Sequence, residues 1–217
     1  KQSRILSKIS NASEILLRIL NDILDYSKIE AGKLELEIKE VSLHETFEQL
    51  EEMFSQSAAQ KGLHLHVSIE EGVPPFIYAD GLRLMQILLN LVGNAIKFTH
   101  EGSVGANVSL VNKEKGYAHL RFSVHDTGIG VSDEKIKALF EPFTQADIST
   151  TRKYGGSGLG LSIVSKLAEA MGSRIEVESC EGEGSIFSFV LEVPISKSTF
   201  HATLPVTPTS LELFDLR

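Results

Sequence analysis

The sequence predicts a mixed α/β domain preceded by one long amphipathic helix. Two kinds of apolar periodicity indicate this fold class. Spacings of three and four run through the first 30 residues, which is typical of a helix with one buried face. Further along, short alternating runs and longer helical patterns follow one another, separated by turns that contain Gly and Pro. A chain of 217 residues is long enough for one such domain and an appended helical element.

The front helix is expected over residues 2–31. Its heptad seam consists of Ile5, Ile9, Ala12, Leu16, Ile19, Ile23 and Tyr26. Leu17, Leu20 and Leu24 widen the apolar face, which suits a four-helix bundle. Because one helix cannot form a bundle alone, we expect the chain to dimerise through it. The alternative is an ordinary packing helix within one domain.

The remaining elements follow from alternation, helical stripes and cap residues. In chain order we expect a strand through Leu34, Leu36 and Ile38, a helix at 43–61, strands at 63–69 and 76–78, a helix at 81–97, a hairpin of strands at 104–110 and 117–125, a helix from Ser132 to Phe140, a helix at 158–171, and strands at 174–179 and 185–193. Ser42 and Asp80 are typical helix N-caps. The polar, aperiodic region 144–155 is expected to be a mobile lid, since long irregular loops are usually functional.

Three polar side chains project from one face of the helix at 81–97. Asn90 and Asn94 are four residues apart and Lys97 follows three later, so they lie on the same side. The rest of this helix is largely apolar, and polar groups are costly to bury without partners. We therefore expect an anionic ligand above the trio. A face that simply meets water is the alternative.

Two glycine-containing segments lie further along the chain. Asp126 follows the strand at 117–125 and precedes Gly128 and Gly130. An acidic acceptor beside a backbone without Cβ atoms could hold a flat heterocycle with an exocyclic amine, although a simple turn is the alternative. The segment 154–161 places four glycines before a helix, which suits phosphate. Its spacing matches neither a P-loop nor a dinucleotide-binding βαβ unit. Phe140 and Phe143 flank Pro142 between these segments, a pattern that core packing alone would also explain.

In this order and spacing, the four segments resemble the N box, first glycine box, phenylalanine box and second glycine box of sensor histidine kinases. The resemblance covers about residues 1–193. It implies the two-layer α/β sandwich of the ATPase superfamily that contains gyrase, the large heat-shock chaperones, histidine kinases and mismatch-repair proteins. It also divides the chain into part of a dimerisation and phosphotransfer hairpin at 1–32, an ATP-binding catalytic domain at 33–194, and a linker or docking tail at 195–217.

The resemblance assigns ATP and Mg²⁺ as cofactors and gives individual residues their roles. Asn94 would be the Mg²⁺ ligand, while Asn90 and Lys97 would contact phosphates and act with it in catalysis. Asp126 would bind the adenine amine, with Gly128 and Gly130 beside the ring. The other implied nucleotide-binding positions are Phe140, Phe143, Gly156, Ser157, Gly158, Leu159, Gly160 and Leu161.

The implied activity is transfer of the ATP γ-phosphoryl group to a histidine, for relay to an aspartate of a response-regulator receiver domain. The family's His-Glu-x-x-x-Pro acceptor motif is absent from this sequence. His44-Glu45 follows Ser42 as part of a capping box instead. We therefore expect the acceptor to lie outside this chain and the isolated chain not to phosphorylate itself. The parent protein could be a hybrid kinase.

Two alternatives remain open at the level of sequence. The chain could phosphorylate a separate protein, or it could be an ATP-operated clamp that hydrolyses ATP. Clamp relatives carry a glutamate general base where this chain has Asn90. Because a carboxamide cannot accept a proton in that role, position 90 favours phosphotransfer.

Composition limits the partners and the cellular compartment that we expect for the chain. The formal net charge is −8 and no basic cluster is present, so we expect no nucleic-acid partner. Cys180 is the single cysteine, which excludes an internal disulfide and fits a reducing compartment. No apolar run approaches membrane-spanning length and no signal peptide is evident. We expect a cytoplasmic module without membrane contact of its own, although its parent protein could be anchored in the inner membrane.

Overall fold

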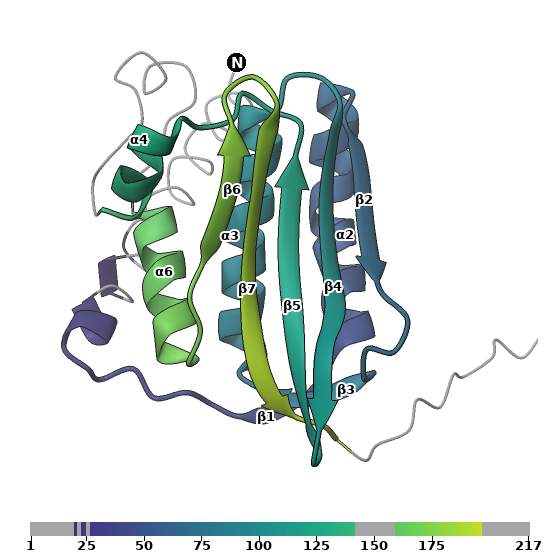
Figure 1. Cartoon of the computed structure of the whole chain (residues 1–217), viewed down its shortest axis with the longest axis vertical. Coiled ribbons are helices and arrows are strands. Elements are labelled where there is room, and N and C mark those ends of the chain that lie inside the picture. The colour runs from purple at the N-terminus through teal and green to yellow at the C-terminus, as the bar shows by residue number, and fades with distance from the viewer. Residues whose placement is uncertain (1–19, 21–22, 25–26, 142–158, 197–217) are drawn as a thin grey trace, which may run out of the picture.

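A five-stranded sheet with helices on one face organises the described part of the chain, which comprises residues 20, 23–24, 27–141 and 159–196 of this computed structural model. The strands lie in the order β2 (His64–Ile69), β4 (Ser103–Glu114), β5 (Tyr117–Asp126), β7 (Gly184–Pro194) and β6 (Glu176–Cys180). β2 pairs with β4 in parallel, and the other neighbours are antiparallel. Helices α2 (Leu43–Lys61) and α3 (Gly81–Phe98) lie behind the sheet in Figure 1, and α6 (Gly160–Ala170) stands beside it and packs on α3.

A second, two-stranded sheet closes one end of the domain. It pairs β1 (Lys39–Ser42) with β3 (Phe76–Ala79) in antiparallel register. Ile195, just beyond β7, bridges to Ile77 of β3. The entry to the domain and the end of its last strand therefore meet at the same small sheet.

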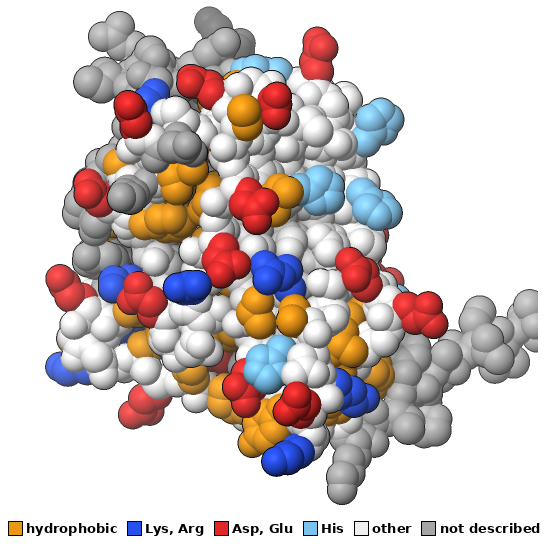
Figure 2. Space-filling model, in the orientation of Figure 1, with side chains coloured by type: hydrophobic (Ala, Val, Ile, Leu, Met, Phe, Trp, Pro, Cys, Tyr) orange, Lys and Arg blue, Asp and Glu red, His pale blue; other side chains and the backbone are white. Residues whose placement is uncertain are grey.

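The core lies between the helices and the inner face of the large sheet. Phe122 of β5 and Phe189 of β7 are both buried, and their ring centroids are 5.1 Å apart. Phe47 of α2 packs on Phe122 with centroids 6.4 Å apart. The opposite face of the sheet carries acidic and basic side chains intermixed (Figure 2). The predicted alternation of the strands is confirmed, because alternate residues of β5 face this core.

Both predicted helix caps are present. The Glu45 amide donates to Ser42 Oγ at 3.2 Å, and the Arg83 amide donates to Asp80 Oδ1 at 3.0 Å. Each bond satisfies one of the amides that a helix start leaves without an intrahelical partner. The capping box predicted at Ser42 is thus a helix start, as the sequence indicated.

The predicted strand through Leu34, Leu36 and Ile38 is wrong. The strand β1 begins only at Lys39, because its partner β3 extends no further than Ala79, the residue opposite Lys39. Leu34 and Leu36 alternate because both are partly buried, Leu34 against the core. Alternation here reflects a chain that runs along the domain surface without a neighbouring strand.

Other boundaries differ by a few residues or lie outside the described part of the chain. β4 continues to Glu114, so the hairpin turn is shorter than predicted. The helix predicted from Ser132 to Phe140 is a short α4 (Asp133–Ile136) followed by a 3₁₀ helix, η1 (Lys137–Phe140). The described residues of the front helix, Leu20, 23–24 and 27–30, are helical. Most of that helix, the predicted lid and the tail from 197 onward are not described. Among described residues, no helix has the length and hydropathy to span a membrane.

Candidate functional site

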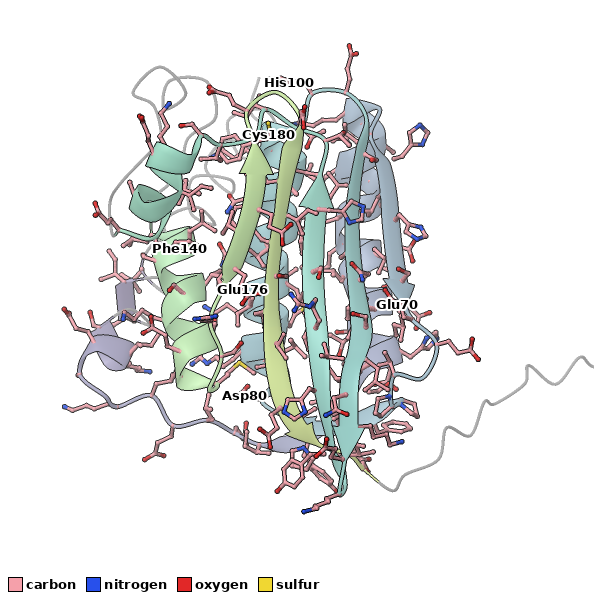
Figure 3. The ribbon with its side chains drawn as sticks, viewed as in Figure 1. Glu70, Asp80, His100, Phe140, Glu176 and Cys180 are labelled. Carbon is pink, nitrogen blue, oxygen red and sulfur yellow. The ribbon has the colours of Figure 1, made fainter. Side chains whose placement is uncertain are left out.

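Two segments that are distant in sequence contact the second half of α3. The loop that follows β5 packs on the end of α3 at Phe98, and the start of α6 packs on its middle at Asn90. In Figure 3, Asp80 marks the beginning of α3 at the opposite end, while His100, just past the end of α3, lies at the same end as Cys180. Phe140, at the end of η1, lies beside α6. These segments hold the predicted polar trio, Asp126 and the last glycine of the second glycine box.

The polar trio lies on α3 as the spacing predicted. Asn90, Asn94 and Lys97 are all half-buried, whereas the opposite face of α3 is fully buried. Asn90 Nδ2 donates to the Gln86 carbonyl at 3.3 Å. Within the described residues Asn94 makes no side-chain hydrogen bond, so its carboxamide oxygen can still bind a ligand. Burial lowers the pKa of Lys97, whose Nζ lies 4.8 Å from the centroid of the Phe98 ring.

Asp126 stands at the end of β5 and is held by backbone amides. The Gly128 amide donates to its Oδ1 at 2.8 Å. Burial raises the pKa of Asp126, and this is the largest influence; the hydrogen bonds from Gly128 and Ser185 and the charge of His125 act in the opposite direction. A half-buried carboxylate whose position is fixed in this way can accept a further hydrogen bond, because its two oxygens have about four acceptor sites.

Packing within the protein requires glycine at positions 128 and 130, in the loop that follows Asp126. A Cβ at Gly128 would lie 2.7 Å from the Phe98 carbonyl oxygen at the end of α3. Gly130 has φ +63°, and a Cβ there would collide with the Cys180 carbonyl. The loop is therefore pressed against α3 on one side and the β6–β7 turn on the other. A ligand is not needed to explain these two glycines.

The start of α6 packs on one member of the polar trio, Asn90. A Cβ at Gly160 would lie 2.8 Å from Asn90 Oδ1, so the second glycine box and the N box touch at this point. Leu159 is buried and Leu161 packs against the core, which leaves their backbones rather than their side chains for ligand contact. Phe140 is half-buried. Phe143, Gly156, Ser157 and Gly158 lie outside the described residues.

Gly160→Ala is expected to displace the Asn90 carboxamide, because the new methyl group needs the space that Asn90 Oδ1 occupies. Because Asn90 can rotate away from the new methyl group, the expected cost is mainly the loss of its hydrogen bond to the Gln86 carbonyl, about 0.5–1.5 kcal/mol. Gly93→Ala is the matched control in α3, since its Cβ would make an ordinary 3.7 Å contact with the Phe54 ring. Thermal unfolding should show a lower midpoint for Gly160→Ala alone. Equal midpoints for the two variants would contradict the close packing of α6 on Asn90.

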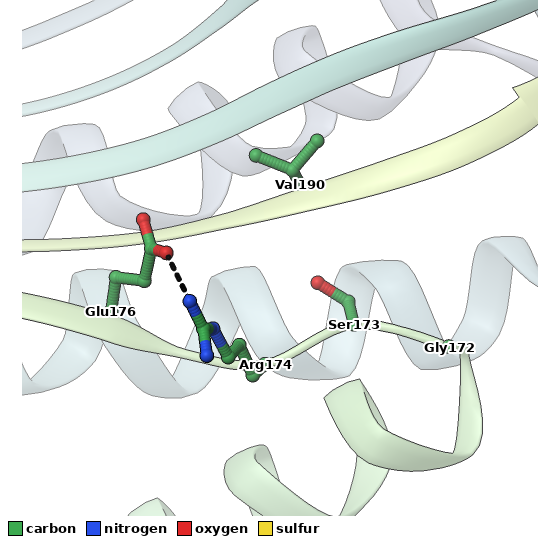
Figure 4. A pocket seen from close by; sticks show the side chains of 5 residues that line it. All are labelled: Gly172, Ser173, Arg174, Glu176 and Val190. Carbon is green, nitrogen blue, oxygen red and sulfur yellow. Dashed lines mark hydrogen bonds and ion pairs between the residues drawn. The ribbon is translucent and has the colours of Figure 1, made fainter.

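A shallow pocket elsewhere on the domain is a weaker candidate. It has a volume of about 390 Å³ and is lined by Gly172, Ser173, Arg174, Glu176 and Val190 (Figure 4). Arg174 Nη2 lies 3.4 Å from Glu176 Oε1, and Arg121 Nη1 lies 3.3 Å from Glu176 Oε2. The charged groups of this pocket are therefore paired with each other. None of its lining residues belongs to the four sequence segments.

Sequence reasoning missed one polar residue near this site, Lys61. It is the last residue of α2, and its Nζ donates to the carbonyls of Ile96 and Lys97 at 2.6 and 3.0 Å. A lysine before the glycine that ends a helix looks like an ordinary C-terminal residue. Its contact with a second helix depends on tertiary packing, which the sequence pattern does not contain.

Comparison with known proteins identifies relatives of this chain. Residues 79–195 match the family described as histidine kinase-, DNA gyrase B-, and HSP90-like ATPase. The sensor protein GacS of Pseudomonas syringae pv. syringae is 42% identical over 206 residues, which is 95% of this chain and 23% of GacS. The chain therefore spans about a quarter of that relative's length.

Two solved structures show the same fold. Full-length ShkA in complex with AMPPNP is 35% identical, with a TM-score of 0.77 over 90% of this chain and 39% of ShkA. The histidine kinase ThkA in complex with the response regulator protein TrrA is 26% identical, with a TM-score of 0.63 over 88% of this chain and 51% of that chain. These matches confirm the predicted two-layer α/β fold and the resemblance to sensor histidine kinases.

Proposed function

Because the chain belongs to the family of histidine kinase-, DNA gyrase B-, and HSP90-like ATPases, we propose that residues 33–194 form the ATP-binding catalytic domain of a sensor histidine kinase. The observation that carries this proposal is the convergence of Asn90, Asn94 and Lys97 with Asp126 and the start of α6. It brings an acidic acceptor to the end of α3 and the start of α6 to its middle, so that both adjoin the helix that carries Lys97 and Asn94, whose carboxamide makes no hydrogen bond among the described residues. The structure of ShkA with AMPPNP, which is similar in sequence and fold, supports an adenine nucleotide as the ligand.

Asp126 would recognise the adenine base. Its carboxylate accepts the Gly128 amide and retains acceptor sites for the exocyclic amine. The tight packing of Gly128 against the end of α3 places the base-binding loop next to the helix that carries Lys97. Base and phosphates would thus be bound by adjoining segments of the chain.

The residues present fit a magnesium ion that is bound mainly by the nucleotide. In the described part of the chain, no cluster of three or more His, Cys, Asp or Glu side chains could hold a metal. Mg²⁺ usually takes few protein ligands and is completed by phosphates and waters, so the Asn94 carboxamide oxygen would suffice as a protein ligand. When bound, the ion would neutralise phosphate charge. Asn90 and Lys97 would contact the phosphates beside it.

The reaction would be an in-line transfer of the γ-phosphoryl group. A bond forms between a histidine nitrogen and the γ-phosphorus, the bond from the γ-phosphorus to the β–γ bridging oxygen breaks, and ADP leaves with that electron pair. Lys97 would stabilise the charge that spreads over the transferred group, and the chain segments would hold the phosphates in line. The amides at the start of α6, beginning at Gly160, would face the phosphates on their other side.

A clamp-type ATPase is the second candidate, and Asn90 argues against it. Hydrolysis transfers the γ-phosphoryl group to water, and it needs a general base nearby that takes the proton of the attacking water. A carboxamide cannot accept that proton. In the structure the Asn90 amide donates to the Gln86 carbonyl, and its Oδ1 side lies against Gly160. This arrangement suits a residue that holds α6 and phosphates in place rather than one that activates water.

The assignments of oligomeric state, location and downstream partner concern the whole protein, and the relatives that suggest them are much longer than this chain. We propose a homodimer formed through helix 2–31, and a cytoplasmic location for the domain. The complex of ThkA with the response regulator TrrA supports a receiver domain as the downstream partner. The acceptor histidine would be presented by a dimerisation hairpin.

Incubation with γ-labelled ATP tests the proposal. The chain should transfer label to a separately supplied dimerisation hairpin that carries the family's acceptor motif, and the label should be acid-labile, as expected for a phosphohistidine. An acceptor His→Ala hairpin is the control and should remain unlabelled. Release of inorganic phosphate without transfer would instead favour the clamp-type ATPase.

A further inference from the structure

The carboxyl end of α3 is held by a lysine from a different helix. Lys61 Nζ lies 2.6 Å from the Ile96 carbonyl oxygen, 3.0 Å from that of Lys97 and 3.5 Å from that of Thr99. Lys61 is the last residue of α2, and Gly62, with φ +72°, ends the helix immediately after it. One ammonium group thus donates to three carbonyls at the point where α3 finishes.

These carbonyls form the negative end of the α3 dipole. The last four carbonyls of a helix lack intrahelical partners, and together they amount to about half a negative charge. A cation placed there both satisfies the carbonyls and offsets that charge. Lys61 does this from outside α3, so it also fixes the end of α3 relative to α2.

The same end of α3 is part of the proposed nucleotide site. Lys97 lies in its last turn, and the Ile129 amide donates to the Phe98 carbonyl at 3.4 Å. Gly128, whose amide holds Asp126, packs on that same carbonyl. A polyanionic nucleotide bound at this place would meet the negative end of the helix unless a cation offset it. Lys61 is located behind that end, on the side of α2.

We propose that Lys61 is a positioning residue for the nucleotide. It holds the end of α3 under the Asp126 loop and offsets the helix charge that would otherwise oppose bound phosphates. The inference rests on the proposed ATP-binding function and deepens it. Lys61 itself does not touch the nucleotide; it acts through α3.

The proposal is tested by comparing how a Lys61 variant binds a charged ligand and an uncharged one. Lys61→Met keeps the aliphatic stem and removes the ammonium group. We expect the affinity of the full chain for Mg-ADP, measured by calorimetry at low salt, to fall about three- to tenfold, as for a lost cation at a helix C-terminus. The affinity for uncharged adenosine should fall less, and the difference should shrink at high salt. Lys61→Arg should recover most of the Mg-ADP affinity.

Lys113→Met is the matched control, because Lys113 is also exposed, and the substitution changes the net charge equally, but it lies at the far end of β4. Equal effects of the two methionine variants would overturn the inference, as would a Lys61→Met chain with a lower unfolding midpoint but unchanged Mg-ADP affinity. Equal losses for adenosine and Mg-ADP would overturn the charge argument. A wild-type chain that binds neither ligand would refute the proposed function itself.

Discussion

Asp126→Asn is expected to weaken ATP binding by about ten- to a hundredfold while leaving the fold intact. The substitution is nearly isosteric, and the amide oxygen of Asn can still accept the Gly128 amide that Asp126 Oδ1 accepts at 2.8 Å. What it removes is the acceptor for the adenine amine, because the Asn amino group would face that amine as a second donor. A hydrogen bond to a charged group contributes about 1.5–3 kcal/mol, which corresponds to this loss in affinity.

A nucleotide without the exocyclic amine separates base recognition from general damage. Purine riboside triphosphate should bind the wild type about as weakly as ATP binds Asp126→Asn, and the variant should hardly distinguish the two ligands. Glu178→Gln, an exposed neutralisation on β6, is the control for lost charge and should leave ATP affinity unchanged. If Asp126→Asn bound ATP as tightly as the wild type does, the adenine role of Asp126 would be refuted.

The pH dependence of the same pair of proteins provides a second readout. Burial raises the pKa of Asp126 above its ordinary value, so the wild type should lose ATP affinity as the pH falls through that raised pKa. For stability the sign is opposite: the folded protein keeps this proton to a higher pH than the unfolded chain does. The group's contribution to stability is therefore largest at low pH and declines as the pH rises through the raised pKa. Asp126→Asn should lack both trends.

The parts of the fold that depend on local chemistry could be predicted from the sequence. Caps at Ser42 and Asp80 follow from side-chain hydrogen bonds within one helical turn, and both were found. The common face of Asn90, Asn94 and Lys97 follows from helical spacing alone. The strand predicted near Leu36 failed because a strand needs a partner, and the partner strand β3 reaches only to Ala79 opposite Lys39.

The site itself required tertiary information. Nothing in the spacing of Asn90 and Gly160, 70 residues apart, indicates that one packs on the other, yet that contact joins the two boxes. The ligand roles came from a family resemblance, not from periodicity. Gly128 and Gly130 were interpreted through a ligand, whereas the structure explains both by contacts with Phe98 and Cys180. Lys61 was missed because its partners lie on another helix.

Asn94→Ala should abolish the dependence of nucleotide binding and phosphotransfer on magnesium. Asn94 is half-buried and, among described residues, its side chain makes no hydrogen bond, so we expect its oxygen to serve a ligand and not the fold. Removing one group that stabilises transition-state charge typically costs about a hundred- to a thousandfold in rate. Phosphotransfer from γ-labelled ATP to the hairpin should fall by at least the lower figure. Asn94→Asp should also be inactive, because it adds an anion beside the phosphates.

Metal-free binding separates loss of the ion from loss of the fold. Without magnesium, Asn94→Ala and the wild type should bind ADP equally, because the base is held through Asp126; adding magnesium should tighten binding only in the wild type. Asn107→Ala, which removes a carboxamide from the other side of the sheet where it bonds Glu70, should behave as the wild type in every assay.

Asn90→Ala should differ from Asn94→Ala, because Asn90 also packs against Gly160 and bonds Gln86. It should therefore lower the unfolding midpoint as well as the transfer rate. Magnesium-dependent transfer that survives in Asn94→Ala would move the metal ligand to another residue, and an Asn94→Ala chain that unfolds early would give Asn94 the structural role that we assign to Asn90.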